Sequence, residues 1–327
     1  MDNQQFKYQK GMRGRGLVAS RRFLYGARAL VYSPVFLTDR ASLLGYRKPL
    51  NDLPTQVMND ICNATNGKGL ERGSRIIARL VRKQTRAFDE TIPKLKKAAK
   101  TTEQQRAAIV QSLRETGFAV IRGFTPEKQA REMYKKMLAN PGRDRKPKDF
   151  ATQQEWLADD TSPRIDANRE TTSAVTDAAN LDFASLQLIA REYLKCRPIQ
   201  LGPNSWTTKA IPSLSTEAMD NNAMAFHSDS DYFGFVKAFM LLTDVNEDSG
   251  PFTFIAGSHL EDRQVQGRRK DSDLGYQASD VRLGMGKPGD LVLAVTTGWH
   301  KASVPKKGHR MMIQWMFTNS LFGSATQ

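Results

Sequence analysis

Apolar residues between positions 199 and 318 recur with the two-residue period of β-strands rather than with helical spacing. The alternation is clear at Leu291, Leu293 and Val295, and again along residues 311–317. We predict strands at about 199–207, 235–243, 252–256, 290–296 and 310–318. Several short strands separated by turn signals predict a sandwich or jelly roll.

Upstream of residue 199 the apolar residues follow helical spacing instead. Thr102 and Gln105 form a capping box that predicts a helix ending near Gly117. Further helices are predicted, one of them at 73–88. Two polar stretches are predicted to be long loops. Residues 143–170 are punctuated by prolines and are predicted to form a surface loop with one short helix, and 260–287 carries no clear period and is predicted to be a lid. The fold class that follows is mainly β, with flanking helices.

Charge divides the 327 residues into two parts. The net charge is +15, yet residues 1–100 carry 21 Lys and Arg against 7 Asp and Glu, and the remainder carries 28 against 27. We therefore predict two regions, a basic and largely helical N-terminal extension at 1–100 and a jelly-roll domain at 101–327. The length is ample for a sizeable core in the second region.

The sequence does not decide what the basic extension contacts. Basic amphipathic segments are predicted within 1–50 and at 73–88, and such helices either pack on a core or lie on an anionic surface. Weak contact with an anionic surface is therefore one expectation. A nucleic-acid partner is not favoured, because no nucleic-acid-binding motif accompanies the Lys and Arg residues.

The chain offers no sequence signal for export or for a membrane span. Cys62 and Cys196 cannot build a disulfide framework in a chain of this size. There is no apolar run of the roughly 20 residues that a membrane span needs and no secretory signal pattern. We expect a cytoplasmic protein without a transmembrane segment.

Two histidines and one aspartate stand where they could hold a metal ion. His227 and Asp229 are two residues apart, so in a strand they point to the same face, and an apolar strand ends at His300. Two histidines and a carboxylate form the facial triad of non-haem Fe(II) oxygenases. Asp231 competes with Asp229 for the acidic role, but the two-residue spacing makes the better chelate. The alternative is that both histidines are ordinary half-buried residues.

Five ordered motifs carry a resemblance to a known family. They are H-S-D at 227–229, T-D-V-N-E-D-S-G-P at 243–251, G-S-H at 257–259, G-D-L at 289–291 with His300, and then Arg310. In this order and spacing the chain resembles the phytanoyl-CoA dioxygenase family of Fe(II)/2-oxoglutarate oxygenases. The resemblance covers roughly residues 105–323, and residues 1–100 match no family that we can name.

The resemblance implies a double-stranded β-helix, the jelly-roll form of that family, with Fe(II) and 2-oxoglutarate as cofactors. It implies a dioxygenase that uses O2 to hydroxylate an unactivated C–H bond of a small-molecule or acyl substrate. The implied metal ligands are His227, Asp229 and His300. The implied anchor for the distal carboxylate of 2-oxoglutarate is Arg310, a cation that can grip a carboxylate with two parallel hydrogen bonds.

One position departs from the family pattern. A hydroxyl residue usually follows the distal histidine by two positions, but here that residue is Ala302. Ser303, Thr297 or Lys237 could replace the hydroxyl. Asn204 and Trp206 lie on a strand that often contributes cosubstrate contacts in such enzymes, so we include both as cofactor-binding candidates.

Two other functions compete with the dioxygenase. The first is a catalytically silent jelly-roll binding protein that uses the basic extension as an interaction module. The second is a metal-dependent cupin enzyme that does not use 2-oxoglutarate. The complete triad argues against the first, and Arg310 has no obvious purpose in the second.

Overall fold

The computed structural model describes residues 24–27, 39–49, 53–144, 149–160, 162–215, 218, 219, 222–261, 269, 271 and 274–323. Its strands are β1 Phe118–Ile121, β2 Gly142–Asp144, β3 Asp149–Phe150, β4 Arg164–Ala167, β5 Ile199–Lys209, β6 Phe235–Leu241, β7 Phe252–Ile255, β8 Val281–Gly284, β9 Leu291–Ala294, β10 His300–Ala302 and β11 His309–Thr318. Its helices are α3 Arg40–Leu43, α4 Leu53–Thr65, α5 Lys68–Leu80, α6 Arg82–Asp89, α7 Ile92–Ala98, α8 Glu103–Glu115, α9 Glu127–Leu138, α10 Gln153–Leu157, α11 Arg169–Asp177 and α12 Phe183–Leu194.

The strands form two sheets in which every neighbouring pair is antiparallel. The larger sheet has the order β1-β9-β6-β11-β5-β4-β2-β3, and the smaller has the order β10-β7-β8. An isolated bridge between His227 and His300 places the segment before Asp229 beside β10. The predicted β core with flanking helices is confirmed.

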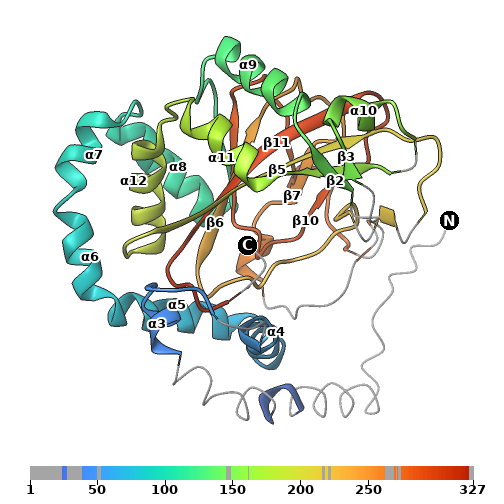
Figure 1. Cartoon of the computed structure of the whole chain (residues 1–327). Helices are drawn as coiled ribbons and strands as arrows, with labels where there is room; N and C mark the ends of the chain where they lie inside the picture. The colour runs from blue at the N-terminus through green and yellow to red at the C-terminus, as the bar shows by residue number, and fades with distance from the viewer. Residues whose placement is uncertain are drawn as a thin grey trace.

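Alternation along the larger sheet gives it two buried faces. The inner face meets the smaller sheet in a cluster that includes Phe239, Phe252 and Met312. The outer face, with Ile313 and Trp315, packs against α8, α9, α11 and α12 (Figure 1). Neighbouring residues of β11 therefore point to opposite sides, so the face of each strand residue decides whether it can reach the interior between the sheets.

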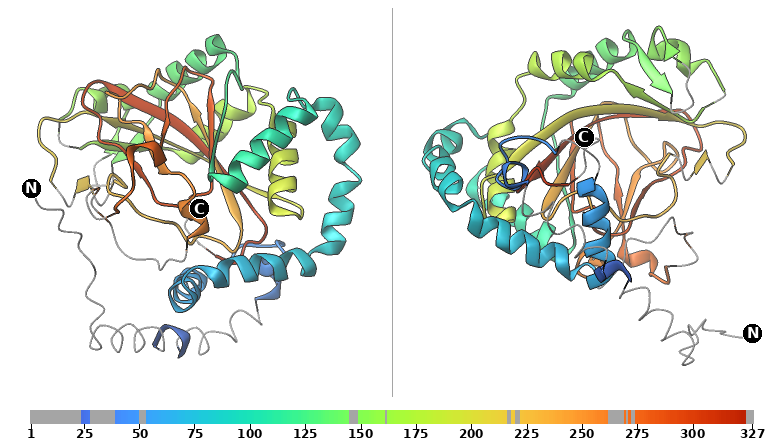
Figure 2. Two further views of the ribbon diagram at one scale, coloured as in Figure 1. Left: turned by 180° about the vertical axis from the view of Figure 1, so that it is seen from behind. Right: turned by 60° about the horizontal axis from the view of Figure 1, so that its bottom comes forward.

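Helices α4 to α7 lie outside these layers and α5 to α7 follow the rim of the molecule (Figures 1 and 2). The predicted helix at 73–88 is divided into α5 and α6 at Val81, whose backbone has φ −91° and ψ 19° and whose side chain is buried. α5 packs closely because it has a glycine at the contact: a Cβ at Gly73 would lie 2.1 Å from Cδ1 of Phe233.

The last residues of the described chain pack beside α3 and α4. Phe322 stacks on Phe233, with ring centroids 6.2 Å apart, and both belong to one core cluster with residues of α4 and α5. The backbone N–H of Leu321 donates to the carbonyl of Ser42 at 2.8 Å. The N-terminal helices thus share a core with the last residues of the described chain.

The capping box at Thr102 and Gln105 is present at the start of α8. α10 confirms the short helix predicted within 143–170, but both predicted loops also contain strands: β3 and β4 lie within 143–170, β2 ends there at Asp144, and β8 lies within 260–287. Part of the predicted lid, including Arg268 and Lys270, lies outside the described residues, as does most of the basic segment at 1–38. None of the described helices is long and apolar enough to cross a membrane.

Candidate metal centre

His227, Asp229 and His300 converge at one end of the interior between the sheets. One ligand atom from each residue lies within 4.8 Å of the other two. Nε2 of His300 is 3.4 Å from Oδ2 of Asp229, and Nε2 of His227 is 3.9 Å from Oδ1. The register explains the convergence, because the segment carrying His227 pairs directly with the start of β10 at His300.

Hydrogen bonds prepare both imidazoles to bind a metal. Nδ1 of His227 lies 3.0 Å from the carbonyl of Ala225, and Nδ1 of His300 lies 2.9 Å from the carbonyl of Gly298. A carbonyl can only accept, so each Nδ1 carries the proton and each Nε2 keeps its lone pair. This is the arrangement that fixes the tautomer of metal-bound histidines.

Asp229 is held in its ionised form. Burial alone would raise its pKa, but the ammonium of Lys237 and the neighbouring imidazoles lower the pKa well below its usual value. Nζ of Lys237 donates to Oδ2 of Asp229 at 2.8 Å and lies 2.9 Å from Oδ2 of Asp231. Two neutral imidazoles and one carboxylate are a donor set that suits Fe(II).

The triad opens into a cavity of about 470 Å3. Its wall includes six of the predicted site residues, the three of the triad together with Asn204, Trp206 and Lys237. Sequence reasoning missed other polar residues in the same wall, namely Arg164, Asp166 and Gln314. Arg164 and Asp166 lie on β4, in a stretch whose predicted loop gave no sign of a strand.

Arg310 lies farther along the same face of β11, two residues from Met312, which lines the cavity. Its side chain is fully buried, and none of its three guanidinium nitrogens has a hydrogen-bond partner among the described residues. Burial, with a smaller effect from Arg164, lowers the pKa of Arg310 to about 9. A buried cation without an anion is costly, so this position calls for a negatively charged ligand.

Two further donors near Arg310 also lack partners in the described part of the chain. Thr208 faces Arg310 across the β5–β11 pair, and its buried Oγ1 makes no hydrogen bond. The indole Nε1 of Trp206, on the same face of β5, is likewise buried and unpaired. A carboxylate could accept from all three groups. Extending the predicted alternation of Asn204 and Trp206 by one step would have identified Thr208.

Ser303 does not line the cavity beside Arg310. Its Oγ lies 2.6 Å from Oγ1 of Thr253 on β7, and the cavity is lined instead by Ala302. Thr297 lies on the other side of Asp229, in the wall of a different cavity. The geometry therefore offers Thr208 and Trp206 as partners for a ligand at Arg310, in place of Ser303.

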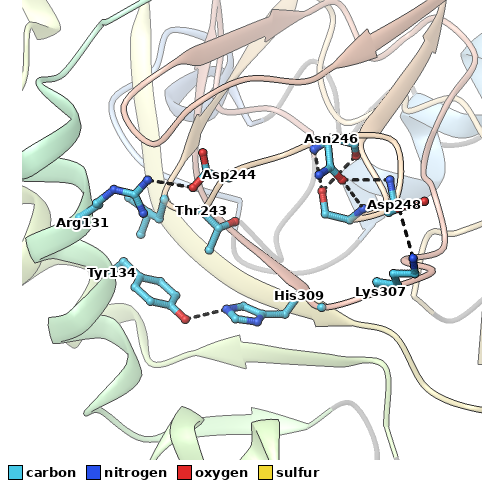
Figure 3. Close-up of a pocket in the computed structure, with 11 residues that line it drawn as sticks. Arg131, Tyr134, Thr243, Asp244, Asn246, Asp248, Lys307 and His309 are labelled. Atoms are coloured by element: carbon cyan, nitrogen blue, oxygen red, sulfur yellow. Dashed lines mark hydrogen bonds and ion pairs between the residues drawn. The ribbon is translucent and has the colours of Figure 1, made fainter.

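The other two histidines lie elsewhere. Nε2 of His259 is 3.2 Å from the carbonyl of Arg114. His309, next to Arg310 on β11, faces a surface pocket, where its ring stacks on Tyr134 and its Nε2 lies 2.6 Å from the phenol oxygen (Figure 3). His309 is half-buried.

Comparisons with known proteins give a family and several distant structures. A model described as phytanoyl-CoA dioxygenase (PhyH) matches residues 113–306. None of the curated proteins matches the chain significantly.

Three solved structures illustrate the likeness. EvdO2 from Micromonospora carbonacea var. aurantiaca is 15% identical over 68% of this chain and 93% of its own, with a TM-score of 0.47. HygX from Streptomyces hygroscopicus, with nickel and 2-oxoglutarate bound, is 16% identical over 69% and 88%, with a TM-score of 0.43. SnoN, a non-haem α-ketoglutarate-dependent epimerase from nogalamycin biosynthesis, is 13% identical over 66% and 82%, with a TM-score of 0.43.

Proposed function

The chain belongs to the phytanoyl-CoA dioxygenase (PhyH) family, and from this premise we propose that it is an Fe(II)- and 2-oxoglutarate-dependent oxygenase with a double-stranded β-helix core. One observation carries the proposal. The cavity between the sheets is lined by a prepared His-Asp-His triad, and the inner face of β11 carries the buried guanidinium of Arg310, which has no hydrogen-bond partner among the described residues. A metal ion fits the first, and an organic anion fits the second.

His227, Asp229 and His300 would hold the metal. The carbonyls of Ala225 and Gly298 fix the protons on Nδ1, so that the lone pairs of the two Nε2 atoms can bind the metal, and Lys237 keeps Asp229 ionised. When bound, Fe(II) and 2-oxoglutarate would supply an oxidant strong enough to attack an unactivated C–H bond. The apolar residues Phe239, Phe252 and Met312 in the wall would limit the access of water to that chemistry.

Arg310 would hold a carboxylate of 2-oxoglutarate with two parallel hydrogen bonds. Thr208 and Trp206 would donate to the same group, which would give their unpaired donors an acceptor. The carboxylate would also supply the counter-charge that Arg310 lacks. This part of the proposal separates the oxygenase from a metal-dependent enzyme without 2-oxoglutarate, in which the unpaired guanidinium would have no purpose.

The reaction that we propose is hydroxylation of a small-molecule or acyl substrate with O2, in the cytoplasm. The test is anaerobic titration of the purified full chain with Fe(II) and then with 2-oxoglutarate, followed by succinate formation on admission of O2. Tight binding of both with succinate release supports an oxygenase. Binding without succinate release would leave the silent binding protein, and metal binding without 2-oxoglutarate binding would leave the plain cupin.

A second proposal concerns the basic extension. On α5, Ile76 and Leu80 are 49% and 53% exposed and lie one turn apart, on the helix face that also carries Arg72. Exposed apolar residues bordered by cations suit an anionic membrane surface, where each Lys or Arg is worth roughly 1 kcal/mol. We propose that this face makes weak contact with such a surface.

Vesicle sedimentation tests the contact. The full chain should bind vesicles that contain an anionic lipid and should not bind neutral vesicles. Rising salt concentration should release the protein from the anionic vesicles. The double variant Ile76→Ser with Leu80→Ser should bind less while 2-oxoglutarate binding is unchanged. Equal binding by this variant, or preferential binding to a nucleic-acid competitor, would contradict the membrane contact.

A further inference from the structure

A second cavity reaches Asp229 from outside the interior described above. It has a volume of about 700 Å3 and lies between α5, the C-terminal end of α12 and the segment that carries the metal ligands. Asp229 is the one described residue that lines both cavities. A molecule bound here would therefore lie next to the metal centre without occupying the place of the cosubstrate.

One part of the wall is apolar. It is formed by Leu70 and Ala78 of α5, Leu194 of α12, and Phe233. α5 can lie close to Phe233 because residue 73 is glycine. This wall suits the hydrocarbon part of a ligand.

The remaining edge of the cavity is cationic. Lys68, Arg79, Arg114 and Lys195 all belong to its lining. The side chains of Arg79 and Lys195 have no ionic or hydrogen-bond partner among the described residues.

The acidic residues at this edge are already engaged. Glu71 forms an ion pair with Arg75 on the next turn of α5, and Glu261 accepts a hydrogen bond from the phenol of Tyr276. The positive charges of Arg79 and Lys195 are therefore left without a counter-charge among the described residues.

A buried hydroxyl adds an independent sign of a ligand. Ser228, between the metal ligands His227 and Asp229, lines the cavity and is 8% exposed. Its Oγ has no hydrogen-bond partner within the described part of the chain. Buried polar groups are normally hydrogen-bonded, so this hydroxyl has the character of a group that awaits a partner.

We propose that this cavity binds the organic substrate, and that the substrate is an anion with an apolar body. Its negative group would lie among Arg79, Arg114 and Lys195, and its apolar part would lie along α5 toward Ser228 and Asp229. This inference rests on the proposed oxygenase function. α5 lies outside residues 113–306, so a helix beyond the matched family region contributes to the choice of substrate.

Octyl phosphate is a suitable probe, with inorganic phosphate and octanol as its two halves. We expect the metal-free full chain to bind octyl phosphate at least about tenfold more tightly than either half, because each charge-assisted hydrogen bond contributes about 1.5–3 kcal/mol. With Mn(II) at the triad, the alkyl protons of the bound probe should relax faster. Absence of binding, or equal binding of octanol, would overturn the proposal.

Two charge reversals on neighbouring helices make a matched pair. Arg79→Glu should weaken octyl phosphate binding about tenfold, and Arg86→Glu, an exposed residue of α6 that does not line the cavity, should change it by less than about twofold. Equal losses in both variants would show attraction to the overall charge only and would refute the site. Mn(II) and 2-oxoglutarate affinities are measured separately, so failure of the metal centre is distinguished from failure of this cavity.

Discussion

Two buried cations on the inner face of the larger sheet differ in whether a carboxylate lies beside them. Lys237 on β6 is 7% exposed and lies between the carboxylates of Asp229 and Asp231. Arg310 on β11 is 0% exposed and has no anion among the described residues. Burial would lower the pKa of Lys237, but the two carboxylates raise it, whereas the pKa of Arg310 falls to about 9.

On the proposed function, this difference separates a cation that is paired within the folded protein from one whose partner is a ligand. Lys237 is partly neutralised by two carboxylates and positions that of Asp229. Arg310 carries the desolvation cost of a buried ion, which an anionic ligand would offset. The presence or absence of a carboxylate partner therefore distinguishes Lys237 from Arg310, although both side chains are buried.

The largest effect is expected from removing the carboxylate of Asp229, which contacts Lys237 and is a proposed metal ligand. Asp229→Ala should abolish metal binding and succinate formation, because the two histidines alone lack the anionic ligand. Calorimetry with Mn(II) measures the loss. Asp231→Ala is the matched control and should retain the metal; an Asp229→Ala protein that still binds metal and turns over 2-oxoglutarate would refute the ligand assignment.

Removing Lys237 should have the next largest effect. Lys237→Met leaves two buried carboxylates facing each other, and breaking a buried ion pair from one side costs about 3–5 kcal/mol of unfolding free energy. Urea unfolding of the metal-free chain measures this cost. Adding Asp231→Asn to the variant should recover part of it, and an unchanged midpoint for Lys237→Met would show that the ammonium is not organising the site.

Arg310→Met should behave in the opposite manner. Without ligand, the variant should be as stable as the parent or more stable by about 1–4 kcal/mol, because an unpaired buried charge is replaced by an apolar side chain. Its affinity for 2-oxoglutarate should fall by about 1.5–3 kcal/mol per lost charge-assisted bond. Arg164→Met, which removes a cation already paired with Asp166, is the control and should not stabilise the protein. An Arg310→Met protein with unchanged cosubstrate affinity would contradict the anchor.

The smallest expected effect concerns His309, a half-buried base for which the neutral form is favoured. Burial lowers its pKa in the folded protein, so folding is favoured when His309 is neutral. Its contribution is complete above the unfolded pKa near 6.5 and is lost as pH falls through the folded pKa. His309→Gln should flatten the stability profile there by less than about 1 kcal/mol; an unchanged profile would show that His309 does not titrate in this range.

The sequence predicts the metal centre and the strands well because both depend on local periodicity. The two-residue spacing of His227 and Asp229 and the alternation around β9 and β11 are visible without any knowledge of distant contacts. The prediction that Arg310 anchors a carboxylate rests on the family resemblance, because alternation along a strand gives the face of a residue and not its ligand.

The features that could not be predicted from the sequence depend on contacts between segments that are distant along the chain. The direction of Lys237 was undecidable until β6 was placed beside the loop that carries Asp229 and Asp231. Thr253 holds Ser303 on the smaller sheet, which no spacing could indicate. Val81 ends α5 because its buried side chain belongs to the core shared with α4, a tertiary effect on a segment that otherwise reads as one helix.

The packing of Phe322 against α4 and α5 also concerns the timing of synthesis. Phe322 belongs to the cluster that these helices share with Leu194 and Phe233, and it is synthesised about 240 residues after the end of α5. Long-range contacts form only when both partners are present, so this part of the core stays incomplete until Phe322 has been added. On a nascent chain, we expect chaperones to contact the apolar faces of α4 and α5 until these distant residues arrive.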